Sequence, residues 1–283
     1  MKKRPASIIH LSLFNGKERE KEIEAEMAAS YWDSSQRLHW ELRKQQRFLC
    51  KEHPGLDLPS ARKLQLFFCH FVQRLGMHLG IPQRIITTAL IYFHRFYSRF
   101  TYWDHDPWIM MPSCVFLAAK VEENVLQGKL IVAATQQIAI DTLDEWPYTE
   151  KDIWEAEFHL LHGLDFYLIV HQPYRSLISF IANSRLETIL TDCWAVVNDS
   201  FKTDLCLQHP PHIVALASIL VAASMKDKAT EAASWFATIN IKMDEVWGVI
   251  EELLDLYNFW NSYQFPEAIQ LVRDFDDKRN PLV

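Results

Sequence analysis

Residues 112–120 read Pro-Ser-Cys-Val-Phe-Leu-Ala-Ala-Lys, and residues 211–218 read Pro-His-Ile-Val-Ala-Leu-Ala-Ser. The two stretches match when Pro112 is aligned with Pro211, because in each a proline precedes an apolar run rich in small residues. Small residues on a helix let neighbouring helices approach closely. A separation of about 100 residues is too long for a solenoid repeat and is typical of two small domains in tandem. The sequence therefore predicts two related bundles, each built around one apolar helix.

Each apolar stretch lies in the middle of five predicted helices, separated by short loops that mostly contain proline. The predicted helices of the first bundle are 61–79, 82–97, 107–123, 129–140 and 149–164, and those of the second are 173–183, 188–207, 211–225, 229–237 and 243–260. Another helix is expected within 31–50, capped by Ser34 or Asp33. The predicted fold class is all-α, with two five-helix bundles in tandem and an extra N-terminal helix. We divide the chain into a tail that is disordered or a charged helix (1–26), an N-terminal helix and linker (27–59), a first bundle (60–170), a second bundle (171–263) and a C-terminal tail (264–283).

Composition narrows the class of function. The 283 residues include only 7 glycines, which argues against a nucleotide-binding enzyme with glycine-rich phosphate loops. The net charge of −7 weighs against a protein that binds nucleic acid through many phosphates. The most apolar segment, 213–224, is too short to span a bilayer. The five cysteines are widely spaced, as expected of reduced thiols in an intracellular protein. We therefore expect protein partners, with no direct contact to nucleic acid or membrane.

Few residues suggest catalysis. His105-Asp106 resembles the metal-anchoring pair of an all-α class of phosphohydrolases, but Asp106 before Pro107 is more typical of a helix cap. His159 and His162 share a helix face, yet no third metal ligand is evident. The sequence has no nucleophile elbow, zinc-protease motif or P-loop. We expect a protein that is not an enzyme and has no cofactor and no metal site.

Two charged residues stand out near apolar helix faces. Lys120 ends the first apolar run, where its stem can pack on the core rim while its ammonium reaches the surface. The pattern alone also allows an ordinary cation that interacts with the helix dipole. Glu157 lies in Ile-Trp-Glu-Ala-Glu-Phe at 153–158, where a fully solvated position is not assured.

The stretch 116–123, Phe-Leu-Ala-Ala-Lys-Val-Glu-Glu, together with the tandem bundles, resembles the cyclin family. Further segments resemble the cyclin C group of that family, and they are 31–35 (Tyr-Trp-Asp-Ser-Ser), 92–97 (Tyr-Phe-His-Arg-Phe-Tyr), 171–175 (His-Gln-Pro-Tyr-Arg) and 194–207. The resemblance extends from about residue 27 to 263, so the two bundles would be the first and second cyclin boxes.

The resemblance implies a non-catalytic subunit that activates the cyclin-dependent kinase of the Mediator complex, in the nucleus, and so regulates RNA polymerase II transcription. It also implies that Lys120 and Glu157 bond backbone groups beside the kinase helix that carries the ion-pairing glutamate. Phe116 and Phe158 would receive an aliphatic kinase side chain, although internal packing explains both equally well. The docking motif Met-Arg-Ala-Ile-Leu of cell-cycle cyclins is replaced here by Arg-Lys-Leu-Gln-Leu at 62–66, so docking of substrate peptides there is not expected.

A second candidate surface lies in the second bundle. Trp194 and Asn198, with Thr191, share one helix face, Asp199 is adjacent, and Tyr257 lies in the last helix of that bundle. We predict a partner groove for another subunit of the Mediator kinase module. The alternative is that Trp194 anchors the core while the two polar residues bond local backbone.

The sequence leaves two other classes of function open. One is the metal-dependent phosphohydrolase that would use His105 and Asp106. The other is a cyclin-fold general transcription factor that contacts DNA, which the acidic net charge disfavours.

Overall fold

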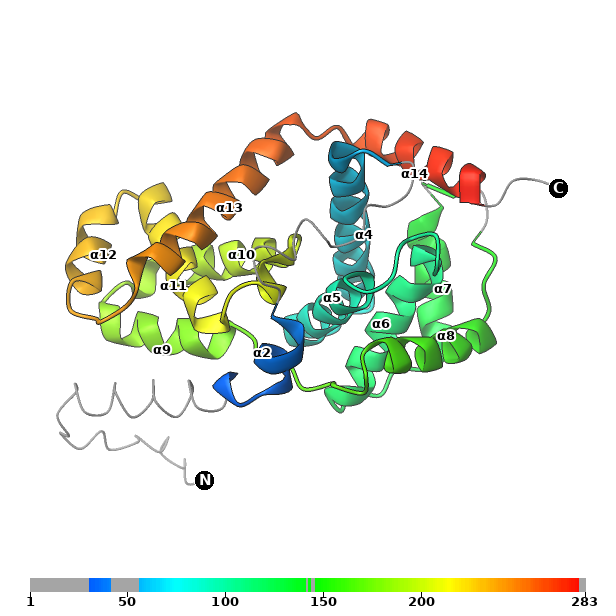
Figure 1. Ribbon diagram of the computed structural model, residues 1–283, viewed down its shortest axis with the longest axis horizontal. Coiled ribbons are helices and arrows are strands. Elements are labelled where there is room, and N and C mark those ends of the chain that lie inside the picture. The colour runs from blue at the N-terminus through cyan, green and yellow to red at the C-terminus, as the bar shows by residue number, and fades with distance from the viewer. Residues whose placement is uncertain (1–30, 42–55, 141, 144–145, 280–283) are drawn as a thin grey trace, which may run out of the picture.

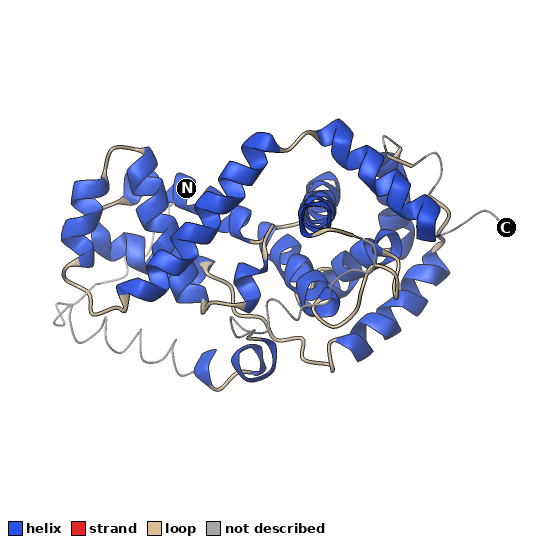
Figure 2. Ribbon diagram, turned by 45° about the horizontal axis from the view of Figure 1, so that its top comes forward, coloured by secondary structure: helices blue, strands red, loops and turns tan. Residues whose placement is uncertain are grey.

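The structure is a computed structural model that describes residues 31–41, 56–140, 142–143 and 146–279. Throughout these residues the regular structure is helical, and there is no strand (Figure 2). The tail predicted over 1–26 lies outside the described residues, as do 27–30, 42–55 and 280–283. The all-α fold class with two tandem bundles is confirmed.

Helix α6 (Pro107–Val121) is the centre of the first bundle, and α4 (Leu58–His78), α5 (Gln83–Tyr97), α7 (Gly128–Ala139) and α8 (Glu150–Gly163) pack around it (Figure 1). Every residue of α6 from Pro107 to Ala119 is buried. Its start follows from the sequence, because the Asp106 side chain accepts a hydrogen bond from the backbone N–H of Trp108 at 2.8 Å. The proline at the first helical position is compatible with the helix, since its missing N–H is not needed there.

The second bundle repeats this arrangement around α11 (Pro211–Met225), which contacts α9 (Tyr174–Ser184), α10 (Leu190–Ser200), α12 (Ala229–Phe236) and α13 (Met243–Ser262). Helix α11 is also apolar on all sides, with small residues such as Ala215 and Ala217 fully buried. The matching sequences at Pro112 and Pro211 therefore lie in the two central helices, as predicted.

Two short helical segments refine the prediction for 188–207. The chain there forms a 3-10 turn at Glu187–Ile189, then α10, and then a second 3-10 turn at Asp204–Leu207. The predicted single helix was too long. The side chain of Thr203 accepts a hydrogen bond from the backbone N–H of Leu205, which starts a new turn in place of a continued helix.

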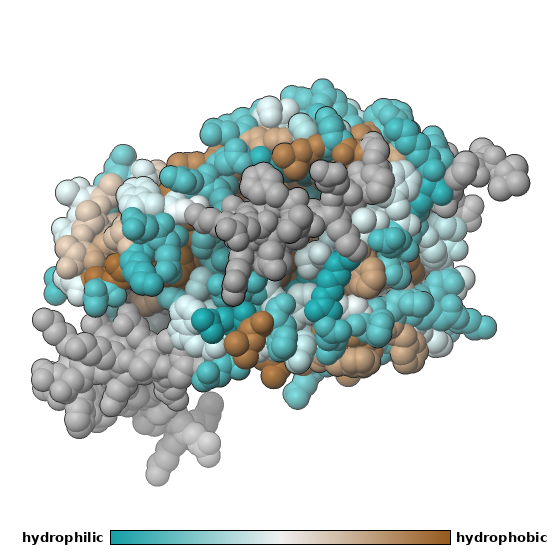
Figure 3. Space-filling model, in the orientation of Figure 1, coloured by the Kyte–Doolittle hydropathy of each residue, from teal (hydrophilic) through white to brown (hydrophobic). Residues whose placement is uncertain are grey.

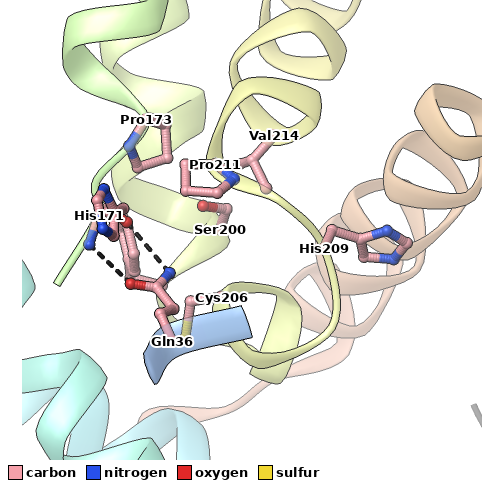
Figure 4. A pocket seen from close by; sticks show the side chains of 9 residues that line it. Gln36, His171, Pro173, Ser200, Cys206, His209, Pro211 and Val214 are labelled. Carbon is pink, nitrogen blue, oxygen red and sulfur yellow. Dashed lines mark hydrogen bonds between the residues drawn. The ribbon is translucent and has the colours of Figure 1, made fainter. Parts of the chain in front are cut away.

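Helix α2 (Ser35–Trp40) is capped by Ser34, which is one of the two predicted capping residues. It lies beside the connection between the bundles, where the Gln36 side chain accepts a hydrogen bond from the backbone N–H of His171 at 2.7 Å. Gln36 also donates to the His171 carbonyl at 3.2 Å (Figure 4). The N-terminal helix thus fastens the linker between the two bundles.

The C-terminal segment contains a helix that the sequence did not predict. Helix α14 (Phe265–Arg279) follows α13 after a short connection and packs back onto α4 of the first bundle (Figure 1). Ala268, Val272 and Phe275 are buried against that bundle. The segment assigned as a tail over 264–283 therefore holds a docked helix through residue 279.

Candidate functional site

Lys120 and Glu157 form a direct ion pair between α6 and α8. The Lys120 ammonium lies 2.8 Å from both carboxylate oxygens of Glu157. It also lies 4.1 Å from the centre of the Phe116 ring, a cation–π distance. The lysine side chain is 48% exposed and the glutamate side chain 12% exposed. The two residues that the sequence singled out separately are thus brought together as one polar feature at the surface.

The end of α6 sets the position of Lys120. The backbone N–H of Asn124 donates to the Ala119 carbonyl at 2.8 Å, and the backbone N–H of Glu123 donates to the Lys120 carbonyl at 3.2 Å. This pair of bonds is a Schellman motif, in which Glu123 takes a left-handed φ of 57°. Glu122 is held by Arg84 and by the Thr88 hydroxyl. The helix therefore stops at a defined residue.

The two predicted aromatic residues have different surroundings. Phe116 is only 5% exposed, so its ring packs in the core and supports the Lys120 ammonium. Phe158 is 73% exposed on α8. Phe116 therefore packs inside the protein, whereas Phe158 is available at the surface to contact a partner.

The structure adds exposed apolar side chains that the sequence reasoning did not name. On α8, Trp154 precedes Phe158 by one helical turn, so the two share a face. The others are Val121, beside Lys120, and Phe166 and Ile169, on the linker after α8. Figure 3 shows brown and tan atoms along the lower edge of the first bundle, where α8 lies. The i, i+4 spacing of Trp154 and Phe158 in the sequence could have predicted that they share a helix face.

These residues define one candidate surface. We call it the α6–α8 face, and its members are Lys120, Val121, Trp154, Glu157, Phe158 and Phe166. The Lys120–Glu157 pair joins α6 to α8, and the hydrogen bond from the Phe166 N–H to the Leu161 carbonyl holds the Phe166 backbone at the last turn of α8. Large exposed apolar side chains next to a charged pair are characteristic of a protein-binding surface.

The predicted groove residues of the second bundle also come together. Trp194 stacks on Tyr174 with ring centres 4.4 Å apart. The Tyr174 hydroxyl donates to the Asn198 side chain at 2.7 Å. Asp199 accepts hydrogen bonds from Tyr257 at 3.3 Å and from Lys202 at 2.8 Å.

These contacts alter the picture drawn from the sequence. Asn198 and Asp199 are held by side chains rather than by local backbone. Trp194, Asn198, Asp199 and Tyr257 all remain partly accessible. Burial and the neighbouring Asp199 carboxylate raise the pKa of Tyr257, so it stays a hydrogen-bond donor at neutral pH.

Three of the residues considered as metal ligands, His105, Asp106 and His159, have other contacts. Asp106 caps α6, pairs with Arg279 and accepts from the Tyr148 hydroxyl. His105 lies against the Phe96 and His159 rings. Among the residues that the structure describes, no group of three or more His, Cys, Asp or Glu side chains could hold a metal ion. The geometry assigns Asp106 a capping role.

A small cavity lies between α2 and the second bundle, lined by residues such as Gln36, His171 and Cys206 (Figure 4). Its space suits about one water molecule and not an organic ligand. Burial raises the pKa of the Cys206 thiol to about 11, so this cysteine is not a reactive thiolate. No helix in the described part of the chain is long and apolar enough to cross a membrane.

Comparison with known proteins identifies the class. The family model described as Cyclin, N-terminal domain, matches residues 26–169. The chain therefore belongs to the cyclin family, whose members are non-catalytic regulatory subunits of kinases. Within that family it is similar to Cyclin-C of Rattus norvegicus, with 38% identity over 244 residues that cover 84% of this chain and 86% of the relative.

Solved structures share the fold. A chain of the yeast TFIIK (Kin28/Ccl1/Tfb3) complex matches with a TM-score of 0.64 and 22% identity, covering 80% of this chain and 99% of that one. A chain of the yeast RNA Pol II CTD kinase CTDK-1 complex matches with a TM-score of 0.65 and 16% identity, covering 77% and 73%. At these identities the likeness concerns the arrangement of helices.

Proposed function

We propose that this cyclin binds and activates a cyclin-dependent kinase, and that the kinase is the one attached to the Mediator complex in the nucleus. The similarity to Cyclin-C over most of both chains supports this proposal. The observation that carries it is the α6–α8 face, where the Lys120–Glu157 pair lies beside exposed Trp154 and Phe158. RNA polymerase II transcription would be the process regulated.

The α6–α8 face suits the proposed activation chemistry. Lysine has three donors, and the two oxygens of glutamate have several acceptor positions, so the pair can bond each other and also backbone groups of a partner. Such charge-assisted bonds are stronger than neutral ones. Trp154, Phe158 and Phe166 supply apolar area around them. A kinase helix held on this face would keep its ion-pairing glutamate in the active position.

The test is Lys120→Ala together with Glu157→Ala, assayed with the Mediator kinase on an RNA polymerase II tail peptide. Each lost charge-assisted bond is worth about 1.5–3 kcal/mol, so kinase binding and activation fall by roughly tenfold or more. The matched control removes another exposed ion pair, Lys226 with Asp192 at 3.2 Å in the second bundle, and leaves activation unchanged. Full activation by the Lys120/Glu157 variant would refute this assignment of the face.

We also propose that the groove formed by Trp194, Asn198, Asp199 and Tyr257 binds another subunit of the Mediator kinase module. A stacked aromatic pair beside oriented amide and carboxylate groups supports this role, since aromatic anchors with fixed polar neighbours are typical of interface hot spots. The groove belongs to the second bundle, whereas the α6–α8 face belongs to the first. The two surfaces therefore share no residue.

The groove is tested with Trp194→Ala plus Asn198→Ala. The expected result is loss of that subunit in pull-down with kinase binding retained. Because Trp194 also packs on Tyr174, a second variant, Thr191→Arg, places bulk on an exposed position of the same helix face without removing any packing. Normal pull-down by both variants, each with a parental melting curve, would contradict the proposal.

A further inference from the structure

The turn after α8 holds two consecutive residues in the left-handed region. Asp165 has φ 49° and Phe166 has φ 59°, although neither is glycine. The N–H of Phe166 donates to the Leu161 carbonyl at 3.1 Å, and the N–H of Asp165 donates to the His162 carbonyl at 3.0 Å. The helix thus ends in a Schellman motif with a strained, non-glycine residue at the position that glycine usually occupies. Such strain persists only where surrounding contacts hold it.

Arg99, at the C-terminal end of α5, supplies those contacts. Its guanidinium donates to the Gly163 carbonyl at 3.1 Å and also binds the Asp165 carboxylate. One side chain therefore grips the turn through both its backbone and its strained residue. Gly163 is itself packed tightly, since a Cβ there would lie 2.6 Å from the Phe96 ring.

The same guanidinium contacts the N-terminal helix. The Arg99 guanidinium carbon lies 4.2 Å from the centre of the Trp40 ring, and Trp40 is almost fully buried at the end of α2. Cation–π contact with a buried ring limits the orientations that the arginine side chain can adopt. A chain of direct contacts therefore runs from α2 through Arg99 to the turn that begins at Gly163.

The linker beyond the turn is also held by its backbone. Arg95 donates to the carbonyl of Tyr167 at 2.8 Å and to that of Ile169 at 3.3 Å. The Tyr92 hydroxyl donates to the Leu168 carbonyl at 2.7 Å. The side chains of Phe166 and Ile169 are left outside, 68% and 69% exposed. The linker is thus held through its backbone while both apolar side chains stay exposed, and one of them, Phe166, belongs to the α6–α8 face.

We propose that Arg99 is a positioning residue for kinase binding: it holds the left-handed turn that presents Phe166, and it makes this presentation depend on Trp40 of the N-terminal helix. The inference rests on the proposed kinase-binding function of the α6–α8 face. Arg99 acts through the turn and does not touch the partner. Without Arg99 the turn relaxes to other backbone conformations, and only a fraction of molecules present Phe166 correctly. The apparent dissociation constant rises as the reciprocal of that fraction.

The experiment measures binding of the kinase to the full chain and to variants at residues 99 and 165. Arg99→Ala is expected to weaken binding about tenfold, since the cost of a left-handed non-glycine residue is of that order. Asp165→Gly on the Arg99→Ala background restores part of the affinity, because glycine adopts the φ of residue 165 without support while Phe166 keeps its own left-handed φ. A loss of global stability would not be repaired in this way.

Two substitutions of one residue separate geometry from charge. Asp165→Ala and Asp165→Gly both remove the carboxylate, but only alanine is strained at φ 49°. Asp165→Ala is therefore expected to weaken binding and Asp165→Gly to leave it nearly unchanged. Trp40→Leu, which removes the ring and leaves a smaller apolar side chain, weakens binding less than Arg99→Ala, and the same glycine restores part of this loss.

A readout without the kinase completes the test. The Phe166 amide donates a hydrogen bond to the Leu161 carbonyl. Its hydrogen exchange is expected to be faster in Arg99→Ala than in the parent protein. Unchanged exchange and unchanged kinase binding in Arg99→Ala would overturn the inference, as would failure of the glycine to rescue. If exchange is faster in Arg99→Ala but the parent protein binds no kinase, the proposed function is refuted. The role of Arg99 in holding the turn would then still stand.

Discussion

Single residues decide how sharply the helices of the α6–α8 face end. Glu123 and Asp165 occupy the left-handed position after α6 and α8, where glycine is the usual residue. Both helix ends carry side chains of the proposed binding surface, Lys120 in one case and Phe166 in the other. The turn at Asp165 is held by a side chain from elsewhere in the chain, because Arg99, just after α5, binds the Asp165 carboxylate.

Glu123→Gly is expected to stabilise the protein by about 0.5–1 kcal/mol. Glycine removes the left-handed strain of about 1–2 kcal/mol, and its greater freedom in the unfolded chain offsets part of that gain. The free energy of unfolding in urea measures the effect. The same replacement at the exposed helical position Glu155 lowers stability by about 1 kcal/mol. A destabilised Glu123→Gly variant would show that the turn is not strained.

At the scale of the element, α14 is the helix whose position depends most on tertiary contacts. Its inner face carries Val272 and Phe275, and the Phe275 ring lies 4.5 Å from that of Trp103. Its polar contacts are equally specific, because Trp108 Nε1 donates to Asp276 at 2.8 Å and Arg279 pairs with the α6 cap Asp106. The C-terminal helix is therefore joined to the start of α6.

Docking of α14 is expected to depend on pH through Asp276. Burial raises the pKa of Asp276 to about 6, against the lowering effects of Trp108 and Arg279, while Asp106 and Asp277 also raise it. The folded state therefore binds this proton more tightly than the unfolded chain. The stability associated with protonation is complete below about pH 4 and declines as the pH rises through about 6.

The variant Asp276→Asn isolates this effect. Asparagine keeps an oxygen for Trp108 Nε1 and cannot ionise. The difference in melting temperature between Asp276→Asn and the parent is expected to shift in favour of the variant as the pH rises from 4.5 to 7.5. A difference that stays constant across this range would mean that Asp276 does not titrate there.

At the scale of the whole molecule, a buried histidine joins the two bundles. His94 of α5 lies with Nε2 2.8 Å from the Phe201 carbonyl and Nδ1 3.1 Å from Asp204, both in the second bundle. Burial lowers the pKa of His94, but the neighbouring Cys69 and Cys206 and the hydrogen bond with Asp204 raise it well above its ordinary value. The ring donates across the interface from both sides.

His94→Ala is expected to lower stability by about 2–4 kcal/mol, because it leaves a cavity and an unpaired buried carbonyl. Calorimetry would show the loss together with a broader transition, as the bundles unfold less cooperatively. The exposed His78 on α4 is the matched control, and its replacement by alanine changes stability by less than about 0.5 kcal/mol. Equal melting of the two variants would show that His94 does not couple the bundles.

Local patterns account for most of the fold that could be predicted. The cap Asp106 and the following Pro107 predicted the start of α6, and Pro211 predicted the start of α11. Helix α14 was missed, although Phe265, Ala268, Val272 and Phe275 have helical spacing. That spacing is weak evidence in a polar segment, because the helix is stabilised by packing against α4, which is distant in the chain.

The candidate surfaces show the same division. Lys120, Glu157, Trp194 and Asn198 were selected from the sequence by residue type and spacing together with the resemblance to cyclins. Their pairing was not predicted, because the partners of each ion pair or stack are far apart in the chain. Phe116 appeared equally suited to the surface and the core, and only the packing of α6 resolved that choice.

The order of helices, their starts and the two-fold repetition follow from short-range chemistry in the chain, because caps, prolines and apolar periodicity act within a few residues. The docked C-terminal helix, the Lys120–Glu157 pair and the Arg99 contact with a strained turn arise only after folding. They depend on distant segments meeting at particular distances, and the periodicity of one helix carries no information about which residues of another will face it.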